Sequence, residues 1–187
     1  MIARIKEVIM NERKPLNVLF LCNHNTARSI MAEAMLNHMG KGNIKAYSAA
    51  SHFSEKEHIH PYALKILEGA DIDTSTLRSK SWDEFMQADS PHMDIVITMC
   101  DETEGEVCPF WQGEPATAHW NYPDPSRFVG TEEEQFNAFS QAVRTLHNQL
   151  DLFVNLPLDT LDRLALEYET RLLESKMLES KRFPAEV

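Results

Sequence analysis

A short polar loop between two regular segments constrains the fold of this chain more than any other feature. The loop follows Asn17-Val-Leu-Phe-Leu21, an apolar run with the length and composition of a buried strand. Apolar residues then recur at helical spacing from Thr26 to Met39, and Gly40 is a stop signal for that helix. Ile44 to Ser48 has the pattern of a second strand. The crossover is long enough to join parallel strands, so the sequence predicts a βαβ unit.

Helix and strand signals continue to alternate beyond this unit. In chain order we predict a helix from His60-Pro61 to about Gly69, a short helix after a capping box at Ser81 to Glu84, a strand from Asp94 to Thr98, a brief strand near Ala118 to Trp120, and a helix after a second capping box at Thr131 to Glu134 that reaches about Asn155. This alternation is typical of an α/β fold.

Length and a break near the C-terminus indicate the domain organisation. A chain of 187 residues can bury one sizeable core and is short for two independent domains. Leu156-Pro157 interrupts the last long helix, and the segment from Leu158 to about Lys176 is again helical by pattern. We therefore expect an N-terminal extension over residues 1–15, one main domain over residues 16–155 and a C-terminal helical extension over residues 156–187.

Charge and hydropathy exclude several classes of partner. The formal net charge of −11 opposes general binding to nucleic acid or to acidic membranes, which both rely on basic patches. No apolar run reaches the roughly 18 residues needed to cross a bilayer. Met1 to Lys14 lacks the apolar centre of a secretory signal, so we expect a cytoplasmic protein. An anionic substrate would need a locally positive pocket on this acidic chain.

The loop Cys22-Asn-His-Asn-Thr-Ala-Arg28-Ser29 provides such a pocket. Because it lies between a buried strand and the first turn of a helix, its backbone N–H groups can converge on an oxyanion at the helix N-terminus. Arg28 offers a planar fork of donors for two oxygens of a tetrahedral anion, and the same positive field favours a thiolate at Cys22. The predicted substrate-binding residues are Asn23, His24, Asn25, Thr26, Ala27 and Ser29, whose hydroxyl could also donate to the sulfur. The alternative is a structural cysteine beside an arginine that faces solvent.

A departing oxygen needs a proton, and Asp124 is the best candidate acid. It lies in Tyr122-Pro-Asp-Pro-Ser126, where a proline on each side restricts the backbone. A solvated turn aspartate is the alternative reading of the same pattern.

The other two of the three cysteines, Cys100 and Cys108, favour redox chemistry. Cys100 follows a predicted strand that should end at the same edge of the sheet as the Cys22 loop. A structural zinc site is disfavoured because such sites use four ligands in tight pairs, whereas here two widely spaced cysteines are followed only later by His119. We expect no resident metal and free thiols at rest, since a reducing compartment disfavours structural disulfides.

Together these motifs resemble a known family. Cys22-x5-Arg28-Ser29, Ser48-Ala-Ala, Thr98-Met-Cys100-Asp, Cys108-Pro and Asp124-Pro125 are similar to arsenate reductases built on the low-molecular-weight protein tyrosine phosphatase fold. The resemblance implies a three-layer sandwich with a central, mostly parallel four-stranded sheet flanked by helices. It also implies arsenic detoxification: Cys22 attacks arsenate, Arg28 and the loop amides stabilise the oxyanion, and Asp124 protonates the leaving oxygen.

The resemblance further implies a thiol relay and a reductant. Cys100 would attack Cys22 and release arsenite, Cys108 would then attack Cys100, and thioredoxin would reduce the product, with phosphate or sulfate as substrate analogues. Family members usually have the last two cysteines slightly closer, which leaves open a glutathione or glutaredoxin route with Cys108 auxiliary. Some relatives hold a potassium ion near the loop, and Asn25, Glu33 and Ser48 stand at compatible places.

Two other functions remain open. A phosphatase for phosphotyrosine or small phosphate esters would use the same Cys22, Arg28 and Asp124, but it needs no resolving cysteine and commonly has an aromatic residue where Ser126 stands. A non-catalytic thiol or oxyanion sensor would form one disulfide per molecule and stop, so turnover distinguishes it from an enzyme.

Overall fold

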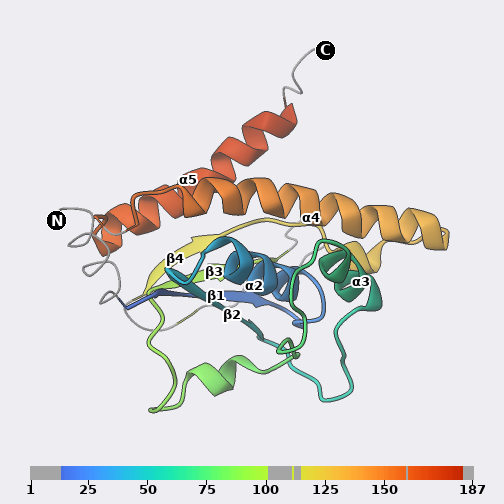
Figure 1. Cartoon of the computed structure of the whole chain (residues 1–187), viewed down its shortest axis with the longest axis horizontal. Coiled ribbons are helices and arrows are strands. Elements are labelled where there is room, and N and C mark those ends of the chain that lie inside the picture. Colours follow the sequence, from blue (N-terminus) through green and yellow to red (C-terminus); the bar gives the residue numbers. More distant parts are fainter. Residues whose placement is uncertain (1–13, 101–110, 112–114, 159, 183–187) are drawn as a thin grey trace.

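In the computed structural model, a parallel sheet forms the centre of the molecule (Figure 1). The structure describes residues 14–100, 111, 115–158 and 160–182. Its strands are β1 (Leu16–Cys22), β2 (Ile44–Ala50), β3 (Ile95–Thr98) and β4 (Ala116–His119), in the order β2-β1-β3-β4. Each neighbouring pair is parallel, which confirms the predicted fold class.

Strand β1 is apolar from Val18 onward because both of its faces are buried there. Val18 and Phe20 point into the larger core cluster, whereas Leu19 and Leu21 belong to a second cluster on the other face. All four side chains are inaccessible to solvent. Continuous apolar runs of this kind are expected in parallel sheets covered on both sides, so the composition of the run follows from the layering.

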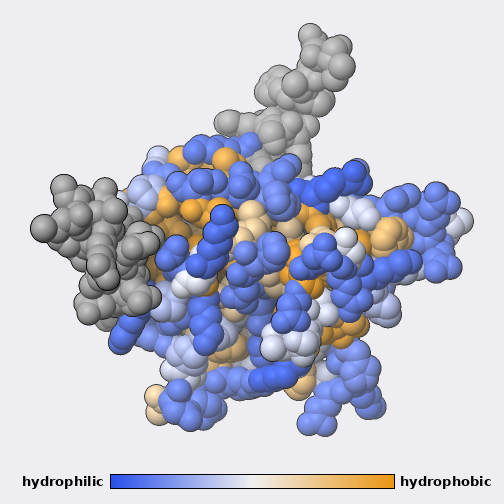
Figure 2. All heavy atoms as spheres, viewed as in Figure 1, coloured by the Kyte–Doolittle hydropathy of each residue, from blue (hydrophilic) through white to orange (hydrophobic). Residues whose placement is uncertain are grey.

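The two faces of the sheet are covered by different elements. Apolar side chains of α2 (Arg28–Met39), α3 (Pro61–Gly69), α4 (Glu132–Val154) and α5 (Arg163–Arg182) all contribute to the larger core cluster. The short 3-10 helix η1 (Trp82–Phe85) lies on the opposite face (Figure 1). Its aromatic residues pack against the smaller cluster. Hydrophilic side chains cover most of the face seen in Figure 2, as the high charge of the chain leads one to expect. No described helix is long and apolar enough to span a membrane.

Helix ends at Gly40, Thr131 and Val154 agree with the sequence, whereas the cap at Ser81 differs. Gly40 ends α2 as predicted, and a side chain there would lie 2.9 Å from the Leu36 carbonyl oxygen. Thr131 and Glu134 form the predicted capping box of α4, which ends at Val154. Ser81 caps the predicted short helix, but its hydroxyl accepts from the Asp83 N–H, and the Glu84 carboxylate pairs with Arg78, so the predicted capping box is not formed.

The chain turns before α5 begins. The second helix was predicted from Leu158, but the carbonyl groups of Leu156 and Pro157 accept turn hydrogen bonds and α5 starts only at Arg163. Leu166 and Leu173 of α5 lie in the same core cluster as β1 and α2. The division at residues 15 and 155 stays a prediction, and residues 1–13 lie outside the described part of the chain.

Candidate active site

The loop between β1 and α2 has its carbonyl groups bonded to the surrounding chain. The carbonyl oxygens of Cys22 and Asn23 accept from the N–H groups of Ser51 and His52, at 3.0 and 2.9 Å. Those of Asn25 and Thr26 accept from the Ser79 hydroxyl at 2.8 Å and the His60 N–H at 2.8 Å. Because a trans peptide directs its N–H opposite to its carbonyl, the amides that follow these carbonyls face the other way. This is the arrangement that an anion-binding loop requires.

Asn25 fixes the sharpest turn of the loop. Its φ of 55° lies in the left-handed region, which asparagine tolerates better than most residues. Its buried amide group donates to the hydroxyl groups of Ser29 and Ser48, each at 2.8 Å, and its side-chain oxygen accepts from the Lys80 N–H at 2.9 Å. These bonds tie the turn to α2, β2 and the segment before η1.

The Cys22 sulfur is buried and held by two polar neighbours. It lies 2.8 Å from the Ser29 hydroxyl and accepts from the Asn25 N–H at 3.2 Å. Since the Ser29 oxygen already accepts from the Asn25 amide, its hydrogen is available to the sulfur. Donors aimed at sulfur suit a thiolate nucleophile.

Arg28 and Asp124 meet although they are far apart in sequence. An Arg28 Nη2 atom lies 2.9 Å from an Asp124 carboxylate oxygen, and Nη1 donates to the Tyr122 carbonyl at 3.2 Å. The side chains are only 3% and 8% exposed, so neither the solvent-facing arginine nor the solvated aspartate describes the structure. The other Asp124 oxygen accepts from the N–H and hydroxyl of Ser126 at the start of η3 (Pro125–Arg127). One carboxylate oxygen therefore faces the anion loop.

Cys100 lies just beyond the end of β3, next to the strand that ends in Cys22. Leu21 is paired with Thr98, and the Met99 N–H donates to the Leu21 carbonyl. Cys100 is buried, and its carbonyl oxygen accepts from the Tyr122 N–H at 3.1 Å. Both cysteines thus occupy the same carboxyl edge of the sheet, as predicted from the strand pattern. Cys108 lies outside the described residues.

Lys80 was not singled out from the sequence, yet it lies directly behind the loop. Its ammonium group is 3.1 Å from a Glu33 carboxylate oxygen, and the same oxygen accepts from the Ser48 hydroxyl. Asn25, Glu33 and Ser48 therefore lie together, but the Glu33 carboxylate is already paired with a cation and the Asn25 oxygen is occupied by the Lys80 N–H. These residues do not fit a potassium ion.

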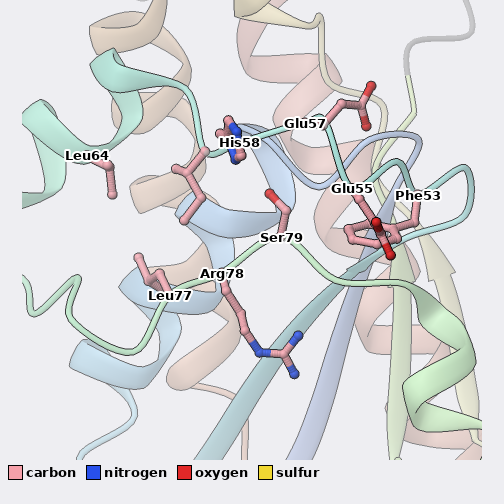
Figure 3. A pocket seen from close by; sticks show the side chains of 9 residues that line it. Phe53, Glu55, Glu57, His58, Leu64, Leu77, Arg78 and Ser79 are labelled. Carbon is pink, nitrogen blue, oxygen red and sulfur yellow. The ribbon is translucent and has the colours of Figure 1, made fainter.

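His24 lies at the outer rim of the loop. Its Nδ1 atom is 2.8 Å from a Glu57 carboxylate oxygen, and both side chains are partly exposed. Glu57 also lines a hollow of about 520 Å³ (Figure 3) together with Phe53, His58, Leu77 and Ser79. None of residues 22–29 lines this hollow, so the hollow lies outside the loop and is separate from the predicted anion-binding site.

The pKa values of two ionisable groups next to the site are shifted by their surroundings. Burial raises the pKa of the Tyr122 phenol, with a smaller contribution from the Glu174 charge, and this hydroxyl donates to Gln149. Burial lowers the pKa of His60 below its ordinary value, and the Asp124 charge partly opposes that shift. Neither residue was singled out as a site residue, because its role depends on contacts that the local sequence does not encode.

Comparison with known proteins agrees with this geometry. Residues 17–162 match the model of the family described as "Low molecular weight phosphotyrosine protein phosphatase". The chain belongs to this family. Its members have in common the fold that the resemblance implied, so that expectation is confirmed.

Named relatives are arsenate reductases. An arsenate reductase of Bacillus subtilis (strain 168) is 31% identical over 136 residues, which are 73% of this chain and 93% of the relative. A glutaredoxin arsenate reductase of Synechocystis sp. (strain ATCC 27184 / PCC 6803 / Kazusa) is 31% identical over 108 residues, 58% of this chain and 77% of the relative. The crystal structure of an arsenate reductase from Archaeoglobus fulgidus DSM 4304 matches with a TM-score of 0.55 at 25% identity and covers 72% of this chain and 98% of that one.

Proposed function

We propose that this protein reduces arsenate to arsenite with Cys22 as the nucleophile. The observation that carries the proposal is the second buried thiol, Cys100, at the same sheet edge as the Cys22 sulfur and the Arg28–Asp124 pair. A phosphoryl-transfer site needs only the first cysteine, whereas reduction of arsenic(V) to arsenic(III) needs two electrons from two thiols. The names of the B. subtilis and A. fulgidus relatives support the same reaction.

In the first step, the Cys22 thiolate attacks arsenic and forms a sulfur–arsenic bond. The loop amides and Arg28 hold the oxyanion, and the arsenic–oxygen bond opposite the sulfur breaks. Asp124 gives its proton to the departing oxygen, which leaves as water. Arg28 contacts Asp124 in the free protein. A bound anion takes over that guanidinium, which releases the Asp124 carboxyl group to contact the departing oxygen.

In the second step, Cys100 attacks the Cys22 sulfur. The sulfur–arsenic bond breaks, its electron pair stays on arsenic, and arsenite leaves behind a Cys22–Cys100 disulfide. Cys108 then attacks Cys100, which restores the Cys22 thiol and moves the disulfide outward. A dithiol reductant of the thioredoxin class, or glutathione with glutaredoxin, supplies the two electrons that close the cycle. The name of the Synechocystis relative supports the second route as an alternative. A catalytic cycle that runs through reduced thiols fits the reducing cytoplasm.

Turnover with defined reductants tests the proposal. The reduced protein is given arsenate, NADPH, thioredoxin and thioredoxin reductase, beside a parallel mixture of glutathione, glutaredoxin and glutathione reductase. NADPH oxidation that depends on arsenate, and that Cys22→Ser abolishes, supports the reductase. Turnover only with glutaredoxin would move the last step away from Cys108. The absence of arsenate-dependent NADPH oxidation in both mixtures would refute arsenate reduction and favour a phosphatase or a sensor.

Cys100→Ser should stop the cycle after the first step. Without the second thiol, arsenite release has no internal electron donor, so we expect loss of multiple turnover with retention of arsenate-dependent protection of Cys22 from alkylation. Mass spectrometry of the alkylated protein measures that protection. Full turnover of Cys100→Ser with thioredoxin would disprove the order of the relay.

Asp124→Asn tests the general acid. The amide keeps the shape of the carboxylate but has no proton of suitable acidity to give, and general acid catalysis typically contributes about 10²–10⁴-fold. We expect the single-turnover rate to fall by roughly 100-fold or more, while phosphate still competes for the loop. Rapid-quench measurement at saturating arsenate gives the rate, and an unchanged value would remove Asp124 from the mechanism.

Phosphatase activity is the second candidate because the matched family is described by that reaction. It would use the same Cys22, Arg28 and Asp124 and would be insensitive to Cys100. Hydrolysis of phenyl phosphate by wild type and Cys100→Ser at equal rates, without arsenate reduction by wild type, would establish that reading.

A further inference from the structure

We propose that α5 positions the acid-bearing segment Trp120–Asp124 and, through it, both Asp124 and Cys100. The inference rests on the proposed roles of these two residues. The family match ends at residue 162, and α5 begins at Arg163, so this support lies outside the part of the chain that the family describes. Figure 1 shows α5 running beside β4 before its far end leaves the body of the molecule.

The contact begins at the edge of the sheet. β4 is the last strand in the order, so among the described residues one side of its backbone has no neighbouring strand. Arg171 of α5 donates from Nε to the Thr117 carbonyl at 2.9 Å and from Nη2 to the Thr117 hydroxyl at 3.3 Å. A strand edge left open is a site for unwanted pairing, and here a helix covers it.

The same helix then holds the chain that leaves β4. The Trp120 indole N–H donates to the Thr170 carbonyl at 3.2 Å, and this contact is buried. The Asn121 N–H donates to a Glu174 carboxylate oxygen at 3.0 Å. Thr170 and Glu174 are four residues apart, so they lie on one face of the helix and accept hydrogen bonds from the adjacent residues Trp120 and Asn121.

Tyr122 connects this held segment to the chemistry. Its N–H donates to the Cys100 carbonyl at 3.1 Å, and its carbonyl accepts from Arg28 at 3.2 Å. Asp124 follows two residues later and contacts the same guanidinium. A shift of residues 120–121 would therefore move the backbone that fixes Cys100 on one side and the acid on the other. Glu174 is accordingly a positioning residue, since it acts through Asn121 and touches no reacting group.

The experiment compares three variants of one helix in the full chain. Glu174→Ala removes the acceptor of the Asn121 N–H, whereas Glu174→Gln keeps an acceptor oxygen and removes only the charge. Glu169→Ala is the matched control, because it removes another partly exposed α5 carboxylate, one whose side chain makes no hydrogen bond to the described residues. The readouts are amide exchange of residues 119–122, the single-turnover rate with arsenate, the KM for arsenate, and the same rate with phenyl phosphate.

We expect Glu174→Ala to speed amide exchange in residues 119–122 and leave amide exchange in residues 22–29 unchanged. Its single-turnover rate should fall roughly three- to tenfold at unchanged KM, less than the ~100-fold that a full 1 Å misplacement of a reacting group can cause. Glu174→Gln and Glu169→Ala should behave like wild type. This pattern separates positioning from a general loss of folding, which would change the KM and exchange at the loop as well.

Three results would overturn the inference: unchanged exchange in Glu174→Ala, an unchanged rate despite faster exchange, or an equal fall in Glu169→Ala. Failure of the proposed function gives a different pattern. If wild type does not reduce arsenate but hydrolyses phenyl phosphate, the proposed reaction is wrong, and the fall of that second rate in Glu174→Ala still decides the role of α5. If wild type turns over neither substrate, amide exchange alone decides. Unchanged exchange in Glu174→Ala contradicts positioning of the segment by α5, and faster exchange supports it.

Discussion

The two sides of the active site are supported in different ways. The Cys22–Ser29 loop is fixed from several directions at once, because its carbonyl groups and the Asn25 side chain bond to β2, α2 and the segments on either side of α3. The Trp120–Asp124 segment is a single stretch of chain, held by α5 at one end and by Arg28 at the other. Cys22 and the anion-binding loop are thus held by many contacts, whereas the position of Asp124 depends on a few long-range contacts.

Arg28 joins the two sides, so its loss should have the largest effect. Arg28→Lys keeps the charge but replaces a planar fork with a point charge that cannot contact the Tyr122 carbonyl and Asp124 in the same geometry. Removing one oxyanion donor costs about 10²–10³-fold in rate, and we expect a fall in kcat/KM for arsenate of at least that size. Steady-state assays with phosphate inhibition measure rate and binding separately. A decrease below about tenfold would mean that charge alone suffices.

Asn25→Ala tests whether the loop side depends on its buried amide. Alanine loses the bonds to Ser29 and Ser48 and is strained at φ 55°, so we expect about 1–3 kcal/mol of lost stability. The single-turnover rate should also fall, by about tenfold, because the Cys22 sulfur loses the partner that orients Ser29.

Asn37→Ala is the control for this variant. Asn37 makes two hydrogen bonds to the Ala46 backbone. Unlike Asn25, it lies within the regular helix α2 and makes no hydrogen bond to the Cys22 loop in the described residues. Urea unfolding should show a loss of stability in both variants, whereas the rate should fall only in Asn25→Ala. Equal rates in the two variants would show that the amide merely stabilises the fold.

The same contrast explains what could be predicted from the sequence. The strands near residues 17, 44 and 94 and the helix after the loop are encoded by local apolar spacing, which a sequence displays directly. The loop could be located because a polar stretch with Cys22 and Arg28 separates two such elements. The sequence predicts a strand near Ala118 to Trp120, slightly later than β4 lies at Ala116–His119. The run Ala-Thr-Ala-His carries little apolar signal, and its burial is set by the neighbouring strand and α5.

The support of the acid could not be predicted in the same way. Trp120 donates to a backbone carbonyl of Thr170, and any residue at position 170 would offer one. Lys80 reaches Glu33 across a large separation in sequence, so no spacing rule pairs them. Tyr122 matters through its backbone, which every residue has. Contacts of this kind leave no pattern in a single sequence, although their effects can be measured.

His60 offers the smallest and most specific test, because it contacts the loop and its pKa responds to the charge of Asp124. Its N–H donates to the Thr26 carbonyl of the loop, its ring stacks on Phe139 at 4.4 Å, and its Nδ1 accepts from the Tyr62 N–H at the start of α3. Burial lowers the pKa of His60 below its ordinary 6.5, against the opposing charge of Asp124. Accepting that hydrogen bond also requires an unprotonated Nδ1.

The direction of the pH effect follows from linkage. The folded protein binds this proton less tightly than the unfolded chain, so the stability that neutral His60 contributes is complete above pH 6.5 and is lost as pH falls toward the lowered pKa. His60→Asn keeps a capping acceptor but does not titrate, and urea unfolding at stepped pH should show a flatter decline than wild type. Asp124→Asn should instead extend the decline to lower pH, because the charge that raises the His60 pKa is gone. Identical pH profiles for wild type and Asp124→Asn would show that the acid side and the loop side are not electrostatically coupled through His60.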